Sequence, residues 1–331
     1  MKLKKSLSKM KLKIASNKLT KVQQTVGALF IAVVVVVGAI FVFASHAASP
    51  SVVATASSGT LTSPATVTSS SSAGSYVQFG KVLSGGGGWP NNWILAASTM
   101  NNVSGYNSTV ANAAFNNSGT YLTAALGSNN PVPSGWRSVP TLNLKSYADF
   151  SSAVSSGTVP SWTKAVLYDP EAWTQTPTNE QQDVVTYIKL FCQLAHAHNW
   201  LCIITPGTDL MNVYPKNSGE TNQQAFVRYN IDGQAAAVAD MVQVQSQTDE
   251  FSPTSYASYV SQVYSEVKAA NANIPFLSGI TANDQGTVAS GSVMAAAANS
   301  VKSYVNGFFL NASSTAPDPA DATSFLQLLG Y

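Results

Sequence analysis

The sequence predicts an α/β fold: a (β/α)8 TIM-like barrel over residues 76–331, preceded by an N-terminal membrane or signal helix and a Ser/Thr-rich linker. Later parts of the chain alternate short apolar runs with helix-like stretches, which is typical of βαβ units and a parallel sheet. Residues 76–331 also match the roughly 250 residues of such a barrel. With 45% hydrophobic residues, 10% charged residues and two cysteines, the chain is neither disordered nor a disulfide scaffold.

The first segment of the chain, residues 1–25, is rich in lysine and is followed by an uncharged apolar run at 26–44. Because lysines stay on the cytoplasmic side of a membrane, we expect the rest of the chain to lie outside the cytoplasm. The run is long enough to span a bilayer, yet Ser45-His46-Ala47 before Ala48 suits signal cleavage. Residues 26–47 are therefore either a signal peptide or a transmembrane anchor. The protein is expected to be extracellular, either secreted or tethered to the membrane through residues 26–44.

Residues 48–75 are dominated by Ser, Thr, Ala, Val and Pro, with an unbroken serine tract at 69–72. Such a composition buries too little apolar surface to offset the entropy of ordering, so a flexible linker is expected. The linker is either a stalk behind a membrane anchor or a spacer between a signal peptide and its domain.

The charge distribution argues against a nucleic-acid partner. Eight of the 17 basic residues lie before residue 22, and all 15 acidic residues lie from Asp149 onward. The folded part is therefore acidic overall, whereas a nucleic-acid-binding protein carries its basic patch on the folded part.

The barrel elements follow from the alternation of apolar runs and helix-like stretches. Strands are expected at 93–97, 139–144, 165–169, 201–205, 241–245, 276–280 and 307–311, and helices at 180–198, 223–239, 256–271, 290–304 and 320–329. Residues 76–82 and 121–126 compete for the remaining strand. In either case, counting back from 307–311 as strand eight makes 165–169 strand four. An open doubly wound sheet is the alternative, but no Gly-rich phosphate motif opens a helix; the glycines at 85–88 suit a flexible loop.

The end of strand four carries the strongest catalytic candidates, because active sites of these barrels lie at the carboxyl ends of the strands. With a period of two, Asp169 and Glu171 share the inward side with Ala165 and Leu167. Neighbouring carboxylates raise each other's pKa and can divide acid and base roles. The structural alternative is that Asp169 belongs to a turn and Glu171 is a solvated loop residue.

Strand six, expected at 241–245, and the residues that follow it supply amides that are expected to point into the barrel. Gln243, Gln245 and Gln247 alternate with apolar or small residues, and amides suit sugar hydroxyls. Gln245 and Gln247 are the predicted substrate-binding residues, whereas the deeper Gln243 suits an internal hydrogen-bond network. Trp173 and Tyr214 are predicted to stack on a sugar ring.

Other polar residues at strand ends are weaker candidates: Ser98, Thr99, Asn143, Thr205, Asp209, Thr281, Asn283, Asp284 and Asn311. Among these, Asn283 and Asn311 are included in the predicted substrate-binding set. Asp209, Asp249, Glu250 and Asp284 are possible partners for Glu171.

Histidine and cysteine chemistry is not expected at the barrel mouth. His196 and His198 fall near the end of one helix, on the opposite side of a barrel, so a Ser-His-Asp or His-zinc site has no histidine there. Cys192 and Cys202 either form one disulfide or stay as two buried thiols. No metal or cofactor is expected, although carboxylates alone suit Mg²⁺ or Ca²⁺.

The passage Asp169-Pro170-Glu171-Ala172-Trp173 resembles the catalytic strand of family-18 chitinase-like glycoside hydrolases, in which an Asp-x-Glu pair ends strand four. The resemblance implies that Glu171 is the general acid and that Asp169 orients the substrate's acetamido group. The chain departs from the family pattern at Lys164 and Leu167, where the family has further aspartates, and at the end of strand six. It also resembles uncharacterised secreted bacterial barrel proteins in the passages TQTPTNEQQ and TPGTDL.

These observations predict an extracytoplasmic glycoside hydrolase-like protein that acts on a polysaccharide or wall glycan by carboxylate acid/base catalysis. The alternative is a non-catalytic glycan-binding surface module on the same barrel.

Overall fold

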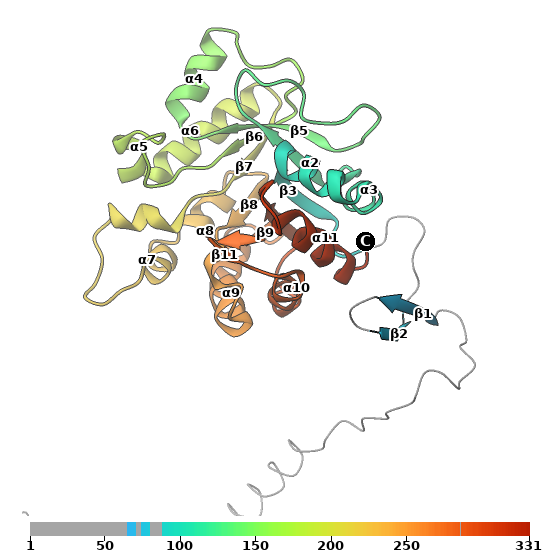
Figure 1. Cartoon of the computed structure of the whole chain (residues 1–331). Coiled ribbons are helices and arrows are strands. Elements are labelled where there is room, and N and C mark those ends of the chain that lie inside the picture. Colours follow the sequence, from blue (N-terminus) through green and yellow to red (C-terminus); the bar gives the residue numbers. More distant parts are fainter. Residues whose placement is uncertain (1–64, 71–73, 80–87, 285) are drawn as a thin grey trace, which may run out of the picture. The chain divides into compact units, whose positions relative to one another are not determined.

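The computed structural model of the chain describes residues 65–70, 74–79, 88–284 and 286–331 (Figure 1). The lysine-rich segment 1–25, the predicted signal or anchor segment 26–47 and most of the predicted linker lie outside these residues. Within the described ranges, no helix combines the length and apolar character needed to cross a membrane.

The chain divides between residues 81 and 82 into two units. In the first, β1 (Ala65–Ser70) and β2 (Gly74–Phe79) form an antiparallel pair, so a small sheet lies where the sequence predicted linker and barrel to meet. β2 covers the described part, 76–79, of the candidate strand 76–82, and because it pairs with β1 it does not supply a barrel strand. That place is taken by β4 (Thr120–Ala124), the competing candidate.

The second unit is a closed barrel of eight parallel strands, which confirms the predicted (β/α)8 barrel (Figure 1). Its other strands are β3 (Asn92–Ala96), β5 (Val139–Leu144), β6 (Ala165–Tyr168), β7 (Leu201–Ile204), β8 (Met241–Val244), β9 (Phe276–Thr281) and β12 (Gly307–Asn311). β12 pairs with β3 and closes the ring, so β6 is the fourth strand as predicted. A short hairpin of β10 (Asn283–Asp284) and β11 (Thr287–Val288) follows β9.

The helices surround the strands in Figure 1. They are α2 (Ala97–Tyr106), α3 (Ser108–Phe115), α4 (Tyr147–Ser155), α5 (Thr178–Gln182), α6 (Val184–Ala197), α7 (Asn222–Tyr229), α8 (Ile231–Ala236), α9 (Pro253–Ala270), α10 (Gly291–Ser300) and α11 (Asp318–Leu328), with 3₁₀ turns η1 (Thr208–Asn212) and η2 (Gln247–Asp249). Two predicted helices are each broken in two. The break between α7 and α8 is at Asn230, whose φ of 52° is left-handed, a conformation that asparagine tolerates. The break between α5 and α6 is at Asp183.

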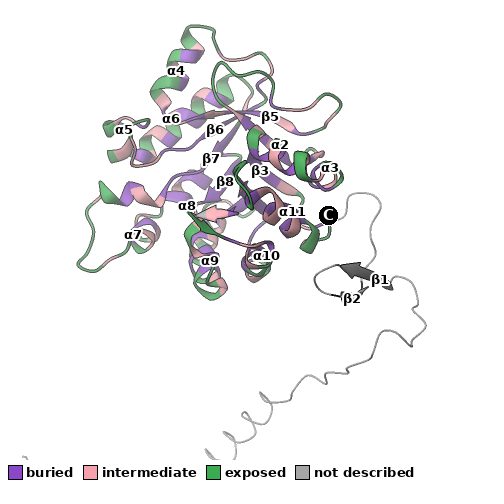
Figure 2. Ribbon diagram, viewed as in Figure 1, coloured by how far each residue is buried: buried purple, intermediate pink, exposed green. Residues whose placement is uncertain are grey.

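Two apolar layers hold the barrel together. Ala165 and Leu167 of β6 face inward with Ile94, Ile203, Met241, Leu277 and Phe309, while Val166 and Tyr168 face the helices. This is the alternation that the sequence predicted for strand four. In Figure 2 the barrel strands are mostly buried. A disulfide between Cys192 of α6 and Cys202 of β7 joins the helix layer to the sheet, which decides between the two states left open by the sequence.

Candidate active site

Four neighbouring strand ends meet around the carboxylate of Asp169, which directly follows β6 and is 5% exposed. Lys145, which follows β5, forms an ion pair with its Oδ2. On the other side, Thr205 after β7 and Gln245 after β8 each donate a hydrogen bond to Oδ1, at 3.2 Å and 3.1 Å. The oxygens of Asp169 are therefore held by three donors from three different strands.

Glu171 lies two residues further on and is half-buried beside Asp169. Its Oε1 accepts a hydrogen bond of 3.0 Å from Gln245 Nε2. Burial and, to a smaller extent, the charge of Asp169 together raise the pKa of Glu171 to about 7, against a hydrogen bond from Gln245 that lowers it. A carboxyl group with this pKa is protonated often enough near neutral pH to act as a general acid.

Gln245 points into the barrel, as the alternation along strand six predicted, and there it connects the two carboxylates, a contact that the sequence did not predict. Its Nε2 lies 3.0–3.2 Å from oxygens of Glu171, Asp169 and the Thr205 main chain. Gln247 also points into the barrel, where its amide lies against Gly279 of β9.

Gln243, the deepest of the three amides of strand six, is enclosed by the protein. Gln243 is fully buried and donates to the main-chain oxygen of Val244, while its Oε1 has no hydrogen-bond partner among the described residues.

A third carboxylate, Asp209 of η1, lies next to Glu171. A Cβ on Gly207 would stand 2.5 Å from Asp209 Oδ1 and 2.6 Å from Glu171 Cγ, so the two side chains converge on the space that this glycine leaves free. The other oxygen of Asp209 accepts a 3.0 Å hydrogen bond from Ala172 N, which ties the loop carrying Glu171 to the next strand end. Burial raises the pKa of Asp209. Across the described residues, no group of three or more His, Cys, Asp or Glu side chains is arranged to hold a metal ion.

Of the two aromatic residues predicted to stack on a sugar, Trp173 lies at the site and Tyr214 does not. Trp173 lies beside the carboxylates: the Lys145 ammonium stands 4.8 Å from its ring centre, and its Nε1 donates to Thr176 at 2.9 Å. Tyr214 is held elsewhere, because its hydroxyl accepts the Val184 amide at 3.1 Å and its ring packs edge-on against Tyr229.

The two asparagine candidates occupy different environments. Asn283 uses its amide oxygen within the β10–β11 hairpin, where it accepts the Gly286 amide at 2.8 Å. Asn311 is two residues from Phe309 on β12, so it shares the inward side of that strand and stands at the barrel mouth.

Both described histidines lie away from this site. His196 Nε2 is 2.9 Å from Asp240, the residue that precedes β8, and His198 stacks on Trp200 with ring centres 4.9 Å apart.

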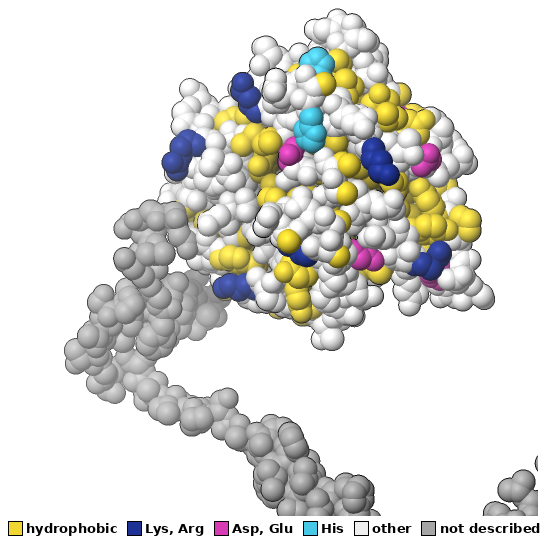
Figure 3. Space-filling view, turned by 180° about the vertical axis from the view of Figure 1, so that it is seen from behind, with side chains coloured by type: hydrophobic (Ala, Val, Ile, Leu, Met, Phe, Trp, Pro, Cys, Tyr) yellow, Lys and Arg dark blue, Asp and Glu magenta, His cyan; other side chains and the backbone are white. Residues whose placement is uncertain are grey.

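Seen from behind in Figure 3, the Lys and Arg side chains stand apart from one another.

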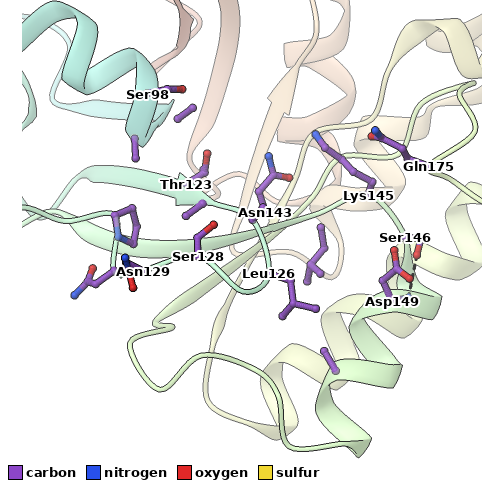
Figure 4. A pocket seen from close by; sticks show the side chains of 18 of the residues that line it. Ser98, Thr123, Leu126, Ser128, Asn129, Asn143, Lys145, Ser146, Asp149 and Gln175 are labelled. Atoms are coloured by element: carbon purple, nitrogen blue, oxygen red, sulfur yellow. Dashed lines mark hydrogen bonds between the residues drawn. The ribbon is translucent and has the colours of Figure 1, made fainter.

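Lys145 and the cavity beside it are the main features that the sequence reasoning missed. Lys145 belongs to the lining of a cavity of about 1390 Å³ over the ends of β3, β4 and β5 (Figure 4). The signal that was available is its position directly after predicted strand 139–144, where the side chain of a barrel residue reaches the mouth.

No family model and no curated protein sequence matches the chain. Among solved structures, it is similar to a chitinase from Chromobacterium violaceum ATCC 12472 (14% identity, TM-score 0.42, covering 72% of this chain and 99% of that chain). It is also similar to a class V chitinase from Pseudomonas fluorescens Pf-5 (12%, 0.39, 72% and 99%) and to triosephosphate isomerase from Bartonella henselae (10%, 0.41, 72% and 98%). The fold and site define the class: a (β/α)8 barrel with a carboxylate pair at its mouth.

Proposed function

We infer that the protein is an extracytoplasmic glycoside hydrolase that cleaves a polysaccharide or wall glycan by carboxylate acid/base catalysis. The observation that carries this proposal is the position of Glu171, half-buried and bonded through Gln245 to the neighbouring Asp169, with its pKa raised to about 7. At one strand end, Asp169 pairs with the Lys145 ammonium whereas Glu171 accepts a hydrogen bond from a neutral amide, and two carboxylates in different environments can divide the roles needed to cleave a glycoside.

In the proposed reaction, Glu171 gives its proton to the glycosidic oxygen as the bond from that oxygen to the anomeric carbon breaks. The carboxylate of Asp169, held in place by Lys145 and Thr205, stabilises positive charge at the anomeric carbon or orients an acetamido group that does so. Water then attacks that carbon and returns a proton to Glu171, so the enzyme is unchanged and one water is consumed.

The location outside the cytoplasm is part of this proposal. Disulfides persist in oxidising compartments, and the Cys192–Cys202 bond suits such a compartment. The uncharged run at 26–44 behind a lysine-rich segment supports export, either as a cleaved signal or as a membrane anchor.

The test is release of reducing ends from chitin, peptidoglycan and common α- and β-glucans by the wild-type protein and by Glu171→Gln. Asn273→Ala is the matched control, because Asn273 is exposed in the loop before β9, at the opposite end of the strands. We expect wild type and the control to release product and Glu171→Gln to lose at least about 100-fold in rate. Equal rates for Glu171→Gln and wild type would refute the assignment. If none of the three folded proteins releases reducing ends but each is retained on one of the glycans, the non-catalytic binding module is favoured instead.

A further inference from the structure

The cavity beside the carboxylates is built from the ends of three strands and the loop that follows Glu171. Its volume is about 1390 Å³, above the range of roughly 300–1,000 Å³ that suits one small ligand. Lys145, Thr174 and Gln175 belong to its lining, and Lys145 also pairs with Asp169, so the cavity lies beside the carboxylate pair. Figure 4 shows Ser98, Thr123, Asn143, Lys145 and Gln175 in succession across it.

The lining of the cavity combines apolar side chains with uncharged polar ones and carries little charge. Its polar side chains are amides and hydroxyls, among them Asn101, Asn129, Asn143, Gln175, Ser98 and Thr123. The charged residues in the lining are Lys145 and Asp149, and the ammonium of Lys145 is already paired with Asp169. Amides and hydroxyls both donate and accept hydrogen bonds, as sugar hydroxyls do. An anionic polymer would need cations that this lining does not offer.

One oxygen atom of the lining receives no hydrogen bond from the described part of the protein. Asn143 Oδ1 is buried from solvent and has no hydrogen-bond partner among the described residues. Asn143 lies on β5 one residue before the strand ends, and Lys145 is two residues further along the same side. A buried polar atom without a partner is unfavourable, and a hydroxyl or amide N–H from a bound molecule would satisfy it.

We propose that this cavity binds an uncharged stretch of glycan, several sugar units long, on one side of the bond that Glu171 protonates, and that Asn143 Oδ1 accepts a hydrogen bond from it. The inference rests on the proposed function and extends it. The substrate is a neutral polysaccharide, and cleavage depends on sugars beyond the two that flank the bond.

The first experiment compares kcat/KM over ladders of neutral chito-oligosaccharides and laminari-oligosaccharides and an anionic oligogalacturonide ladder. For wild type and Asn273→Ala, kcat/KM should rise with chain length on a neutral ladder and stay low on the anionic one. Asn143→Ala should flatten that rise, lowering the ratio of kcat/KM for long over short chains by about tenfold, the effect of one hydrogen bond to a sugar. A ratio unchanged by Asn143→Ala, or preference for the anionic ladder, would overturn the proposal.

The second experiment separates the failure of this inference from the failure of the proposed function. Titration calorimetry with the same neutral ladders on Glu171→Gln, with and without Asn143→Ala, measures binding without turnover. Tighter binding of longer chains that is lost with Asn143→Ala supports the cavity assignment even where no variant hydrolyses. Affinity independent of both chain length and Asn143, in a protein that does hydrolyse, would refute the cavity assignment alone. Melting temperatures of all variants establish that they are folded.

Discussion

The raised pKa of Glu171 has a consequence for stability that can be measured without knowing the substrate. Its pKa is raised from an ordinary value of 4.5 to about 7, chiefly by burial. The folded protein therefore holds a proton on Glu171 over a pH range in which the unfolded chain has lost it. The stability that this proton confers is complete below about pH 4.5 and is lost as the pH rises through about 7.

The size of the effect follows from the shift. One pKa unit corresponds to about 1.4 kcal/mol, which gives about 3 kcal/mol for the whole transition. Glu171 is only partly buried, so solvent screening reduces this to about 2 kcal/mol. In a domain of this size, 1 kcal/mol changes the melting temperature by about 2–4 °C. Replacing Glu171 by the uncharged, similarly shaped glutamine removes the ionisation and with it the pH dependence.

The assay is thermal unfolding of wild type and Glu171→Gln at pH 5 and pH 8. At pH 5 the two should melt within about 2 °C of each other, and at pH 8 the variant should gain about 4–8 °C relative to wild type. The Asn273→Ala control carries no charge at its exposed site and should keep a constant difference from wild type at both pH values. If Glu171→Gln also keeps a constant difference, the carboxyl does not hold its proton in the folded state and the acid assignment loses its basis.

Three further perturbations have expected outcomes. Gly207→Ala places a Cβ 2.5 Å from Asp209 Oδ1 and 2.6 Å from Glu171 Cγ on a backbone (φ −72°, ψ 139°) that already suits alanine, so both side chains must move and the release of reducing ends should fall about 100-fold. Asp232→Asn should raise the melting temperature at pH 8 and have less effect near pH 4, because burial raises the pKa of Asp232 and neither carboxyl oxygen has a partner among the described residues. The double substitution Cys192→Ser and Cys202→Ser should lower the free energy of unfolding, measured in urea, by about 2–3 kcal/mol. A reductant should lower the stability of wild type but not that of this variant.

The strand-end rule explains why much of the site could be predicted. Each barrel strand has a side-chain period of two, so an inward apolar residue such as Leu167 fixes the direction of Asp169 and Glu171 beyond it. The same rule placed Gln245 opposite them, and all three meet in the structure.

The features that the sequence did not predict depend on contacts that a periodic pattern does not record. The apolar spacing continues across Asn230, so the two helices on either side of it are expected as one. Residues 76–82 and 121–126 have similar strand patterns, and closure of the barrel decides between them. The position of Tyr214 is set by Val184, a residue 30 positions earlier in the chain.

Lys145 contacts both the proposed glycan cavity and the carboxylate of Asp169, so the charge of a bound ligand affects the carboxylate pair. Its ammonium pairs with Asp169, approaches the ring of Trp173 and also forms part of the cavity wall. A neutral glycan in the cavity leaves this ion pair intact, so Asp169 keeps its cation and Glu171 keeps the neighbouring positive charge that limits the rise of its pKa. An anionic ligand would compete with Asp169 for the ammonium of Lys145 and leave the buried Asp169 and the half-buried Glu171 without it, which is unfavourable in a partly desolvated site. The preference for an uncharged substrate is therefore built into the same residue that holds the carboxylate pair in place.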